Sequence, residues 1–205
     1  MPQPPDPLPP TFCDQPVLTL AEALLGCHIW HEGVLLQITE VEAYHARESG
    51  CHAHRGRTPR TAVMFGPAGH AYVYLCYGLH TMLNVVAEAE GVAAAVLIRG
   101  AAVRAGAEQV TIRRGGRLDL SGPGKVGQAL GLDPTWSGAR LDGPLRLCAG
   151  APPEGSTLRR GPRVGIDYAA PADRALPWRL WLEGPGLPRV VGGGRRPPAG
   201  QRPGA

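Results

Sequence analysis

The chain has 205 residues, of which 29 are Gly and 22 are Pro, and 43% of its residues are hydrophobic. That length predicts one domain, and the hydrophobic content excludes a chain that is disordered throughout. The formal charge is +4, and all of it comes from four Arg in residues 184–205, because the 17 basic and 17 acidic side chains of residues 1–183 cancel. The high pI therefore only weakly supports a nucleic-acid-binding face on the folded part.

The composition changes near both ends of the chain. Residues 1–11 are rich in Pro, and residues 184–205 are rich in Gly, Pro and Arg. Such segments bury too little apolar surface to offset the entropy of ordering. We therefore expect a flexible N-terminal arm, a folded domain at residues 12–183 and a flexible C-terminal tail.

Neither a membrane span nor a secretory signal is expected. No run of 18 apolar residues occurs, and residues 1–10 contain no basic residue and no apolar segment. Without an export signal, the five Cys are expected to be reduced. These features predict a cytoplasmic protein, and we expect a bacterial one.

The first regular element expected is a short helix that begins at the capping-box pair Thr19 and Glu22 and ends at Gly26. Beyond it, segments rich in β-branched and aromatic residues predict strands. These strands lie at 34–44, 70–77, 82–87, 92–99, 144–148, 163–167 and 178–183. A second helix is expected at 123–130, and long loops are expected at 46–62 and 100–120. The short connections predict a β-rich α+β domain with a mostly antiparallel sheet.

Two carboxylates and a phenol lie on one face of the first of these strands. Side chains alternate along a strand, so Glu40, Glu42 and Tyr44 point the same way. Two carboxylates and a phenol next to a long polar loop are unusual in a hydrophobic core, and they could form a reaction centre. A solvated outer face is an equally good interpretation of this segment alone.

Three of the five Tyr are clustered in a second strand. Tyr72 and Tyr74 share a face, whereas Tyr77 points to the other side and precedes a Gly turn. An aromatic side chain at a turn can wedge between base steps, and flat rings can stack on a base. Ordinary packing of the core and of a hairpin also explains Tyr in a strand, and the residues alone favour it.

The remaining polar clusters predict anion contacts better than a metal site. Cys and His occur at 27–31 and 51–54, but no CxxC pair or zinc-finger spacing is present. Arg57 and Arg60 lie in a Gly/Pro loop and suit phosphate contacts. Lys125 ends a Ser-Gly-Pro-Gly-Lys segment that fails the Walker A pattern, although a helix N-terminus of this kind can hold a phosphate.

Seven segments, taken in order, resemble the alkyladenine (3-methyladenine) DNA glycosylase family over roughly residues 16–183. They are TEVEAY (39–44), CHAHRGRTPR (51–60), MFGPAGHAYVYLCYGLH (64–80), LNVV (83–86), AVLIRG (95–100), SGPGKVGQALGL (121–132) and GPRVGIDYA (161–169). The resemblance implies one compact α+β domain around a curved, mostly antiparallel β-sheet with flanking short helices. It implies a monofunctional DNA glycosylase of base excision repair, located with chromosomal DNA.

The activity implied by the resemblance is the removal of alkylated or deaminated purines from double-stranded DNA. The damaged base is flipped out of the duplex, and a Glu-activated water hydrolyses the N-glycosidic bond. The resemblance implies no metal, no other cofactor and a monomeric enzyme without a membrane partner. On the family pattern, Glu42 matches the general base and Arg99 the arginine beside it, and Val164 matches the position whose backbone carbonyl also holds the water.

The resemblance also assigns a base pocket and a DNA-contacting surface. The side chains matched to the pocket are Tyr44, His52, Tyr74 and Asn84. Asn84 matches the residue that crowds the pocket floor against the extra amino group of guanine. Tyr77 matches the side chain that intercalates in place of the flipped nucleotide, and Met64 matches a DNA-contacting position. The loop between His52 and Arg60 is one residue shorter than in many relatives.

Two other functions are compatible with the residues. One is a non-catalytic module that binds damaged DNA or structured RNA, in which case Glu42 and Arg99 are scaffold. The other is a Cys/His metal hydrolase. Release of free base from alkylated DNA separates the first from a glycosylase, and activity in EDTA separates the second.

Overall fold

The computed structural model of the chain describes residues 3 and 5–190. Eight strands occur in this part of the chain, and they pair antiparallel in one sheet. They are β1 (His28–His31), β2 (Val34–His45), β3 (Ala71–Cys76), β4 (His80–Val86), β5 (Ala94–Ala105), β6 (Arg146–Cys148), β7 (Thr157–Gly161) and β8 (Arg179–Glu183). The hydrogen-bonded order is β3-β4-β5-β2-β1-β6, and β8 pairs with both β2 and β7.

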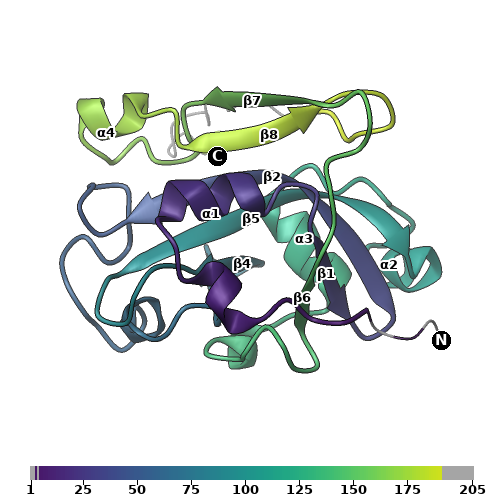
Figure 1. Cartoon of the computed structure of the whole chain (residues 1–205), viewed down its shortest axis with the longest axis horizontal. Coiled ribbons are helices and arrows are strands. Elements are labelled where there is room, and N and C mark those ends of the chain that lie inside the picture. The colour runs from purple at the N-terminus through teal and green to yellow at the C-terminus, as the bar shows by residue number, and fades with distance from the viewer. Residues whose placement is uncertain (1–2, 4, 191–205) are drawn as a thin grey trace, which may run out of the picture.

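The sheet curls around β2. One edge of this strand pairs with β5 along nearly its whole length, whereas the other edge pairs first with β1 and then, over residues 40–42, with β8. The register with β5 shifts on both sides of Glu40. Such bulges bend a strand and increase its twist. Because β2 changes partner at this bend, β8 and β7 form a two-stranded ribbon that lies above the rest of the sheet in Figure 1.

Short helices flank the sheet. The α-helices of the described part are α1 (Val17–Ala23), α2 (Ala107–Arg113), α3 (Pro123–Leu130) and α4 (Pro171–Ala175), with 3-10 turns at Pro10–Cys13, Ala62–Phe65 and Pro134–Trp136. A Cβ atom at Gly127 of α3 would lie 2.3 Å from the carbonyl oxygen of Thr81 on β4, so the close approach of α3 requires glycine. In residues 3 and 5–190, no helix is long and apolar enough to cross a bilayer.

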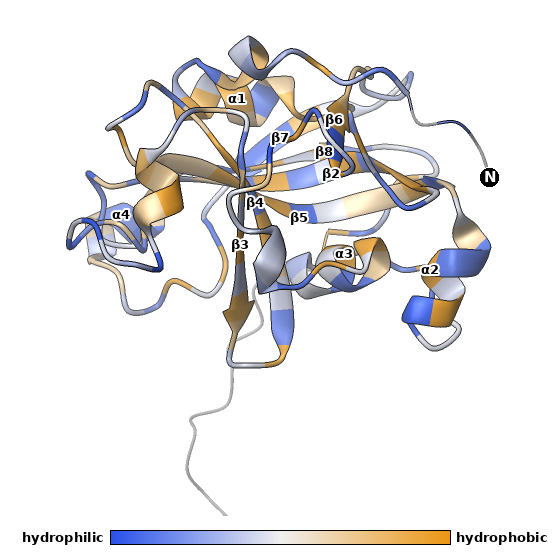
Figure 2. Ribbon diagram, turned by 90° about the horizontal axis from the view of Figure 1, so that it is seen from below, coloured by the Kyte–Doolittle hydropathy of each residue, from blue (hydrophilic) through white to orange (hydrophobic). Residues whose placement is uncertain are grey.

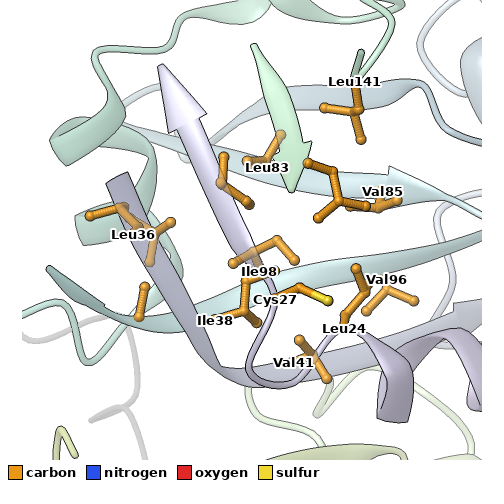
Figure 3. Packing of buried hydrophobic residues seen from close by; sticks show 14 of the residues in the cluster. Leu24, Cys27, Leu36, Ile38, Val41, Leu83, Val85, Val96, Ile98 and Leu141 are labelled. Carbon is orange, nitrogen blue, oxygen red and sulfur yellow. The ribbon is translucent and has the colours of Figure 1, made fainter. Parts of the chain in front are cut away.

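The main core consists of apolar side chains of the sheet together with those of α1, α2 and α3. Leu24, which follows α1, belongs to this cluster with Ile38 and Val41 of β2 and Ile98 of β5 (Figure 3), and all four side chains are fully buried. Burying such a side chain contributes about 1.5–3 kcal/mol. The sequence-based prediction of an α+β fold with one curved antiparallel sheet is confirmed.

Most expected elements lie where the sequence places them. The strands expected at 34–44, 70–77, 82–87 and 178–183 are β2, β3, β4 and β8, and the helix expected at 123–130 is α3. The strands expected at 92–99 and 144–148 correspond to β5 and β6. Residues 46–61 form turns without a strand, as expected for that loop.

Two expectations about the second half of the chain are wrong. Residues 100–120 are not all loop, because β5 continues to Ala105 opposite Leu35 and is followed by α2. Because β2 is long, its pairing with β5 continues beyond residue 99, where the apolar segment of β5 ends. Residues 163–167 form no strand, and β7 lies earlier, at 157–161. Instead, residues 163 and 164 form hydrogen bonds with β2 and with the loop that follows β2.

The N-terminal part differs from expectation in its details. The first helix begins at Val17 rather than at Thr19, because the Glu88 carboxylate accepts a hydrogen bond of 2.9 Å from the Val17 N–H. A capping partner 71 residues away has no local signal in the sequence. The strand β1 is not among the elements that the sequence predicts, because its HIWH segment is only four residues long.

The N-terminal segment touches the sheet. Pro7 forms a β-bridge with Cys148, and the Leu8 N–H donates to the Leu147 carbonyl at 2.7 Å. The domain limits at residues 12 and 183 stay a prediction. Residues 1, 2 and 4 of the expected arm, and residues 191–205 of the expected tail, lie outside the described residues.

Candidate active site

A cavity of about 510 Å³ opens between the end of β2, the β3–β4 hairpin and the segment at 164–168. Many residues singled out from the sequence line it: Tyr44, His52, Arg60, Met64, Tyr74, Tyr77, Asn84, Arg99 and Val164. Other residues that line the cavity were not predicted as pocket residues from the sequence, among them Tyr72, Met82, Leu97 and Tyr168. Arg57 and Lys125 do not line it. Cavities of 300–1,000 Å³ suit small ligands.

Glu42 has no exposed surface and does not itself line this cavity, but it lies directly behind two residues that do. Its Oε1 accepts a hydrogen bond of 2.8 Å from the Val164 N–H, and its Oε2 accepts one of 2.8 Å from the Tyr44 hydroxyl. Both donors line the cavity. Burial raises the pKa of Tyr44 well above its usual value, so its hydroxyl stays protonated and can donate.

Opposing effects act on the charge of Glu42. Burial raises the pKa of this carboxyl above its usual 4.5, because a carboxylate loses its hydration in a protein interior. The Arg99 guanidinium opposes this shift most strongly, followed by the Val164 N–H and the Tyr44 hydroxyl. The Arg99 Nε lies 3.5 Å from Oε1. The net direction is upward, so Glu42 takes up a proton more readily than an exposed glutamate.

Two carboxylates of β2 lie against Arg99 of β5, which the register between the two strands skips. The Arg99 Nε lies 2.9 Å from Glu40 Oε1, and the Arg179 Nε donates to the same oxygen at 2.6 Å. Glu40 and Glu42 therefore face two guanidinium groups, and the cluster is neutral when all four are ionised. The expected common face of Glu40, Glu42 and Tyr44 is confirmed, and the solvated-face interpretation is wrong, since Glu40 is only 4% exposed.

Three aromatic side chains form another wall. The Tyr72 and Tyr74 rings lie 5.2 Å apart, as their shared strand face predicts, and His52 meets Tyr74 edge-on at 4.7 Å. The His52 Nδ1 lies 3.1 Å from the Tyr72 hydroxyl. Burial and the nearby Arg60 charge lower the pKa of His52 to about 4, so its imidazole is neutral at pH 7. Asn84 is held by a bond of 3.0 Å from its Nδ2 to the Tyr72 carbonyl.

Arg163 packs against Tyr44 and Trp178 next to the site, and no sequence pattern indicates this role beyond its position beside Val164. Its guanidinium lies 4.7 Å from the centroid of the Tyr44 ring and 5.2 Å from that of Trp178. It donates two bonds of 2.7 Å to the Glu48 carboxylate and one of 2.9 Å to the Ala43 carbonyl. These contacts fix the Tyr44 ring and bring the Val164 N–H to Glu42.

The β3–β4 hairpin projects from the body of the domain on the side opposite α1 (Figure 2). At its tip, Tyr77 and Gly78 have φ angles of +52° and +69°. A left-handed φ at a tyrosine costs energy and needs support from its surroundings. Tyr77 is 73% exposed and Leu79 is 78% exposed, so the tip presents apolar surface to solvent.

The other residues singled out from the sequence have varied surroundings. Met64 is buried against the cavity, and Arg57 is exposed. Lys125 pairs with Asp119 and contacts the Ser121 hydroxyl, and this pairing lowers the pKa of Asp119 to about 2.

The Cys and His residues do not gather into a metal site in the described part of the chain. No group of three or more His, Cys, Asp or Glu there is arranged to hold a metal ion. His28 and His31 instead place their Nδ1 atoms 3.0 Å and 2.7 Å from backbone carbonyl oxygens.

Comparison with known proteins gives a consistent result. The family model for methylpurine-DNA glycosylase matches residues 11–185. A DNA-3-methyladenine glycosylase from Arabidopsis thaliana is 50% identical over 190 residues, which cover 87% of this chain and 74% of the relative. Relatives from Frankia casuarinae and Nitrosococcus oceani, both described as candidate 3-methyladenine DNA glycosylases, are each 46% identical. They cover 91% and 85% of this chain, and 92% and 89% of the relatives.

The Arg163–Glu48 pair predicts a large loss of stability when it is broken. Arg163→Met leaves the Glu48 carboxylate buried without its cation, and such a change costs about 3–5 kcal/mol. Arg159→Met removes a pair with Glu183 that is more than half exposed, and should cost less than about 1 kcal/mol. Urea unfolding of both variants measures the difference. Equal stability of the two would show that the buried pair is not a structural support.

Proposed function

The chain belongs to the methylpurine-DNA glycosylase family, and from this premise we propose that it excises alkylated or deaminated purines from double-stranded DNA. Such an enzyme is a hydrolase of N-glycosyl bonds. The observation that carries the proposal is the buried Glu42 carboxylate, which two lining residues of an aromatic cavity hold by hydrogen bonds. A binding module gains nothing from a carboxylate whose burial opposes its charge.

Glu42 is proposed as the general base. A carboxylate has about four acceptor sites, of which the Val164 N–H and the Tyr44 hydroxyl use two. A free site can take a proton from a water that attacks C1′ of the damaged nucleotide. Cleavage of the glycosidic bond passes through an oxocarbenium-like state, which a nearby carboxylate also stabilises. Arg99 keeps the carboxylate ionised and limits its orientation. That the Val164 carbonyl holds the same water stays part of the proposal.

The aromatic cavity is proposed to receive the extracted base. A base inside the stack is out of reach of Glu42, so the nucleotide must be flipped out at a cost of a few kcal/mol. Tyr44, His52 and Tyr74 would contact the base, and Asn84 would crowd the amino group of guanine. Tyr77, exposed at the hairpin tip, would fill the gap in the duplex and offset part of the cost.

The distribution of paired and unpaired arginines supports DNA contact around the cavity mouth. Within the described residues, the side chains of Arg47, Arg55 and Arg57 make no hydrogen bond or ion pair. Arginines outside this loop are mostly bound to carboxylates or carbonyl groups, as for Arg140 and Arg160. Unpaired guanidinium groups in one loop suit phosphate contacts. Met64 and Lys125 are kept as proposed DNA contacts.

The monomeric state, the absence of a cofactor and the cytoplasmic, bacterial location stay predictions. The 50% identity to a plant protein means that the match does not point to a bacterial origin.

Replacing the proposed base tests the reaction directly. Glu42→Gln keeps the size of the side chain and an oxygen that can accept hydrogen bonds, but it removes the basic group. We expect excision of 3-methyladenine from duplex DNA to fall by a factor of about 100–10,000, whereas binding to the lesion duplex is retained. Glu90→Gln, at an exposed carboxylate, is the control. Unchanged excision by Glu42→Gln would reject the role of Glu42, and no excision by the unmodified protein would favour a binding module.

The raised pKa of Glu42 predicts that activity is lost as the pH falls, starting at a higher pH than for an ordinary glutamate. As the pH falls through this pKa, the carboxyl is protonated and can no longer accept a proton from water. The acid limb of the rate profile should therefore lie above pH 4.5, the usual value for Glu. Arg99→Met should move this limb to higher pH, because the opposing cation is lost, and Arg99→Lys should restore it. A limb that does not move in Arg99→Met would argue against the coupling.

The hairpin tip predicts a difference between duplex and single strand. Tyr77→Ala should weaken binding to a lesion duplex more than binding to the same lesion in a single strand, because only the duplex has a gap to fill. Ile112→Ala removes an apolar side chain on α2 that is 68% exposed, and it should change neither affinity. Fluorescence anisotropy with both DNA forms measures the effect. Equal weakening on both would count against intercalation.

A further inference from the structure

An exposed arginine without a carboxylate partner lies at the edge of the candidate base cavity. Arg60 lines the cavity, and its guanidinium carbon is 4.9 Å from the centroid of the Tyr74 ring. No carboxylate in the described part of the chain pairs with it. The other two arginines near the cavity differ, because Arg99 lies against Glu40 and Glu42, and Arg163 is bound by Glu48.

The field of Arg60 reaches several walls of the cavity. After burial, its charge is the second cause that lowers the pKa of His52. It also opposes the rise that burial causes in the pKa values of Tyr72 and Tyr74. The guanidinium therefore acts on the aromatic groups that a base would contact.

Resting on the proposed function, we propose that Arg60 is a specificity-determining residue that biases the cavity toward neutral damaged purines and against cationic ones. A guanidinium over Tyr74 occupies the same electron-rich ring that would attract a cationic purine. The two positive charges also repel each other, with the effective dielectric constant of about 20 that applies near a protein surface, because Arg60 is exposed. A neutral purine meets no charge repulsion and has less cation–π attraction to lose.

The effect of the Arg60 charge can be measured even if Arg60 moves when a base binds. If a base must displace the guanidinium from Tyr74, the cost falls on neutral and cationic bases alike and cancels in their ratio. Loss of a phosphate contact cancels in the same way. Only a cation that stays near the bound base changes the ratio, so the ratio isolates the proposed effect.

The test compares the release of two bases, cationic 3-methyladenine from methylated duplex DNA and neutral hypoxanthine from a duplex oligonucleotide. Neither base carries the 2-amino group of guanine, so the proposed discrimination by Asn84 does not enter. Rates are measured at subsaturating enzyme, where they include binding, and spontaneous release is subtracted. Arg60→Gln should raise the ratio of 3-methyladenine to hypoxanthine excision about 3- to 30-fold, the range of a single cation–π contact.

Matched variants separate charge from other effects. Arg60→Lys keeps the charge and should leave the ratio near that of the unmodified protein. Arg57→Gln removes an exposed arginine of the same loop that does not line the cavity, and should slow both reactions equally.

A ratio that is unchanged or lower in Arg60→Gln would overturn the proposal, with equal slowing of both reactions identifying Arg60 as a phosphate contact only. If the unmodified protein released neither base, the proposed function itself would fail. Activity of the unmodified protein with an unaltered ratio in Arg60→Gln would reject only the role of Arg60.

Discussion

The burial of one carboxylate is the constraint on which the rest of the site depends. Removing a charged group from water costs several kcal/mol unless opposite charges and hydrogen bonds replace the lost hydration. Glu42 has no exposed surface, and the Arg99 guanidinium, the Val164 N–H and the Tyr44 hydroxyl replace that hydration. Each comes from a different segment, so the fold must hold β2, β5 and the 163–168 segment together for the carboxylate to stay charged.

The bend in β2 makes this arrangement possible. Next to Glu40 the register skips Arg99 of β5, which lies against both carboxylates, and the other edge of β2 pairs there with β8. The β8 strand brings Arg179 to the same Glu40 oxygen that Arg99 approaches. A regular β2–β5 ladder would lack both the bend and the place for this second guanidinium.

The sequence predicted the parts of this site that depend on local pattern and on family resemblance. Alternation along β2 placed Glu40, Glu42 and Tyr44 on one face, and the Gly after Tyr77 marked the hairpin tip. Contacts between distant segments could not be predicted from the sequence. Examples are the Glu88 carboxylate that caps α1 and the Glu48 carboxylate that binds Arg163. The 163–167 segment looked like a strand because of its apolar residues, but its backbone N–H at Val164 binds a carboxylate instead of a ladder partner.

The two arginines that stack on aromatic walls have different electrostatic consequences. Arg163 lies behind Tyr44 and is neutralised by Glu48 through two short hydrogen bonds, so its main effect is to fix the ring in place. Arg60 lies over Tyr74 without a carboxylate, so its charge is felt in the cavity. An aromatic slot alone would attract any cationic purine, because cations bind aromatic faces. If the cavity receives a damaged base as proposed, the charge balance around the rings would affect its selectivity as well as the rings themselves.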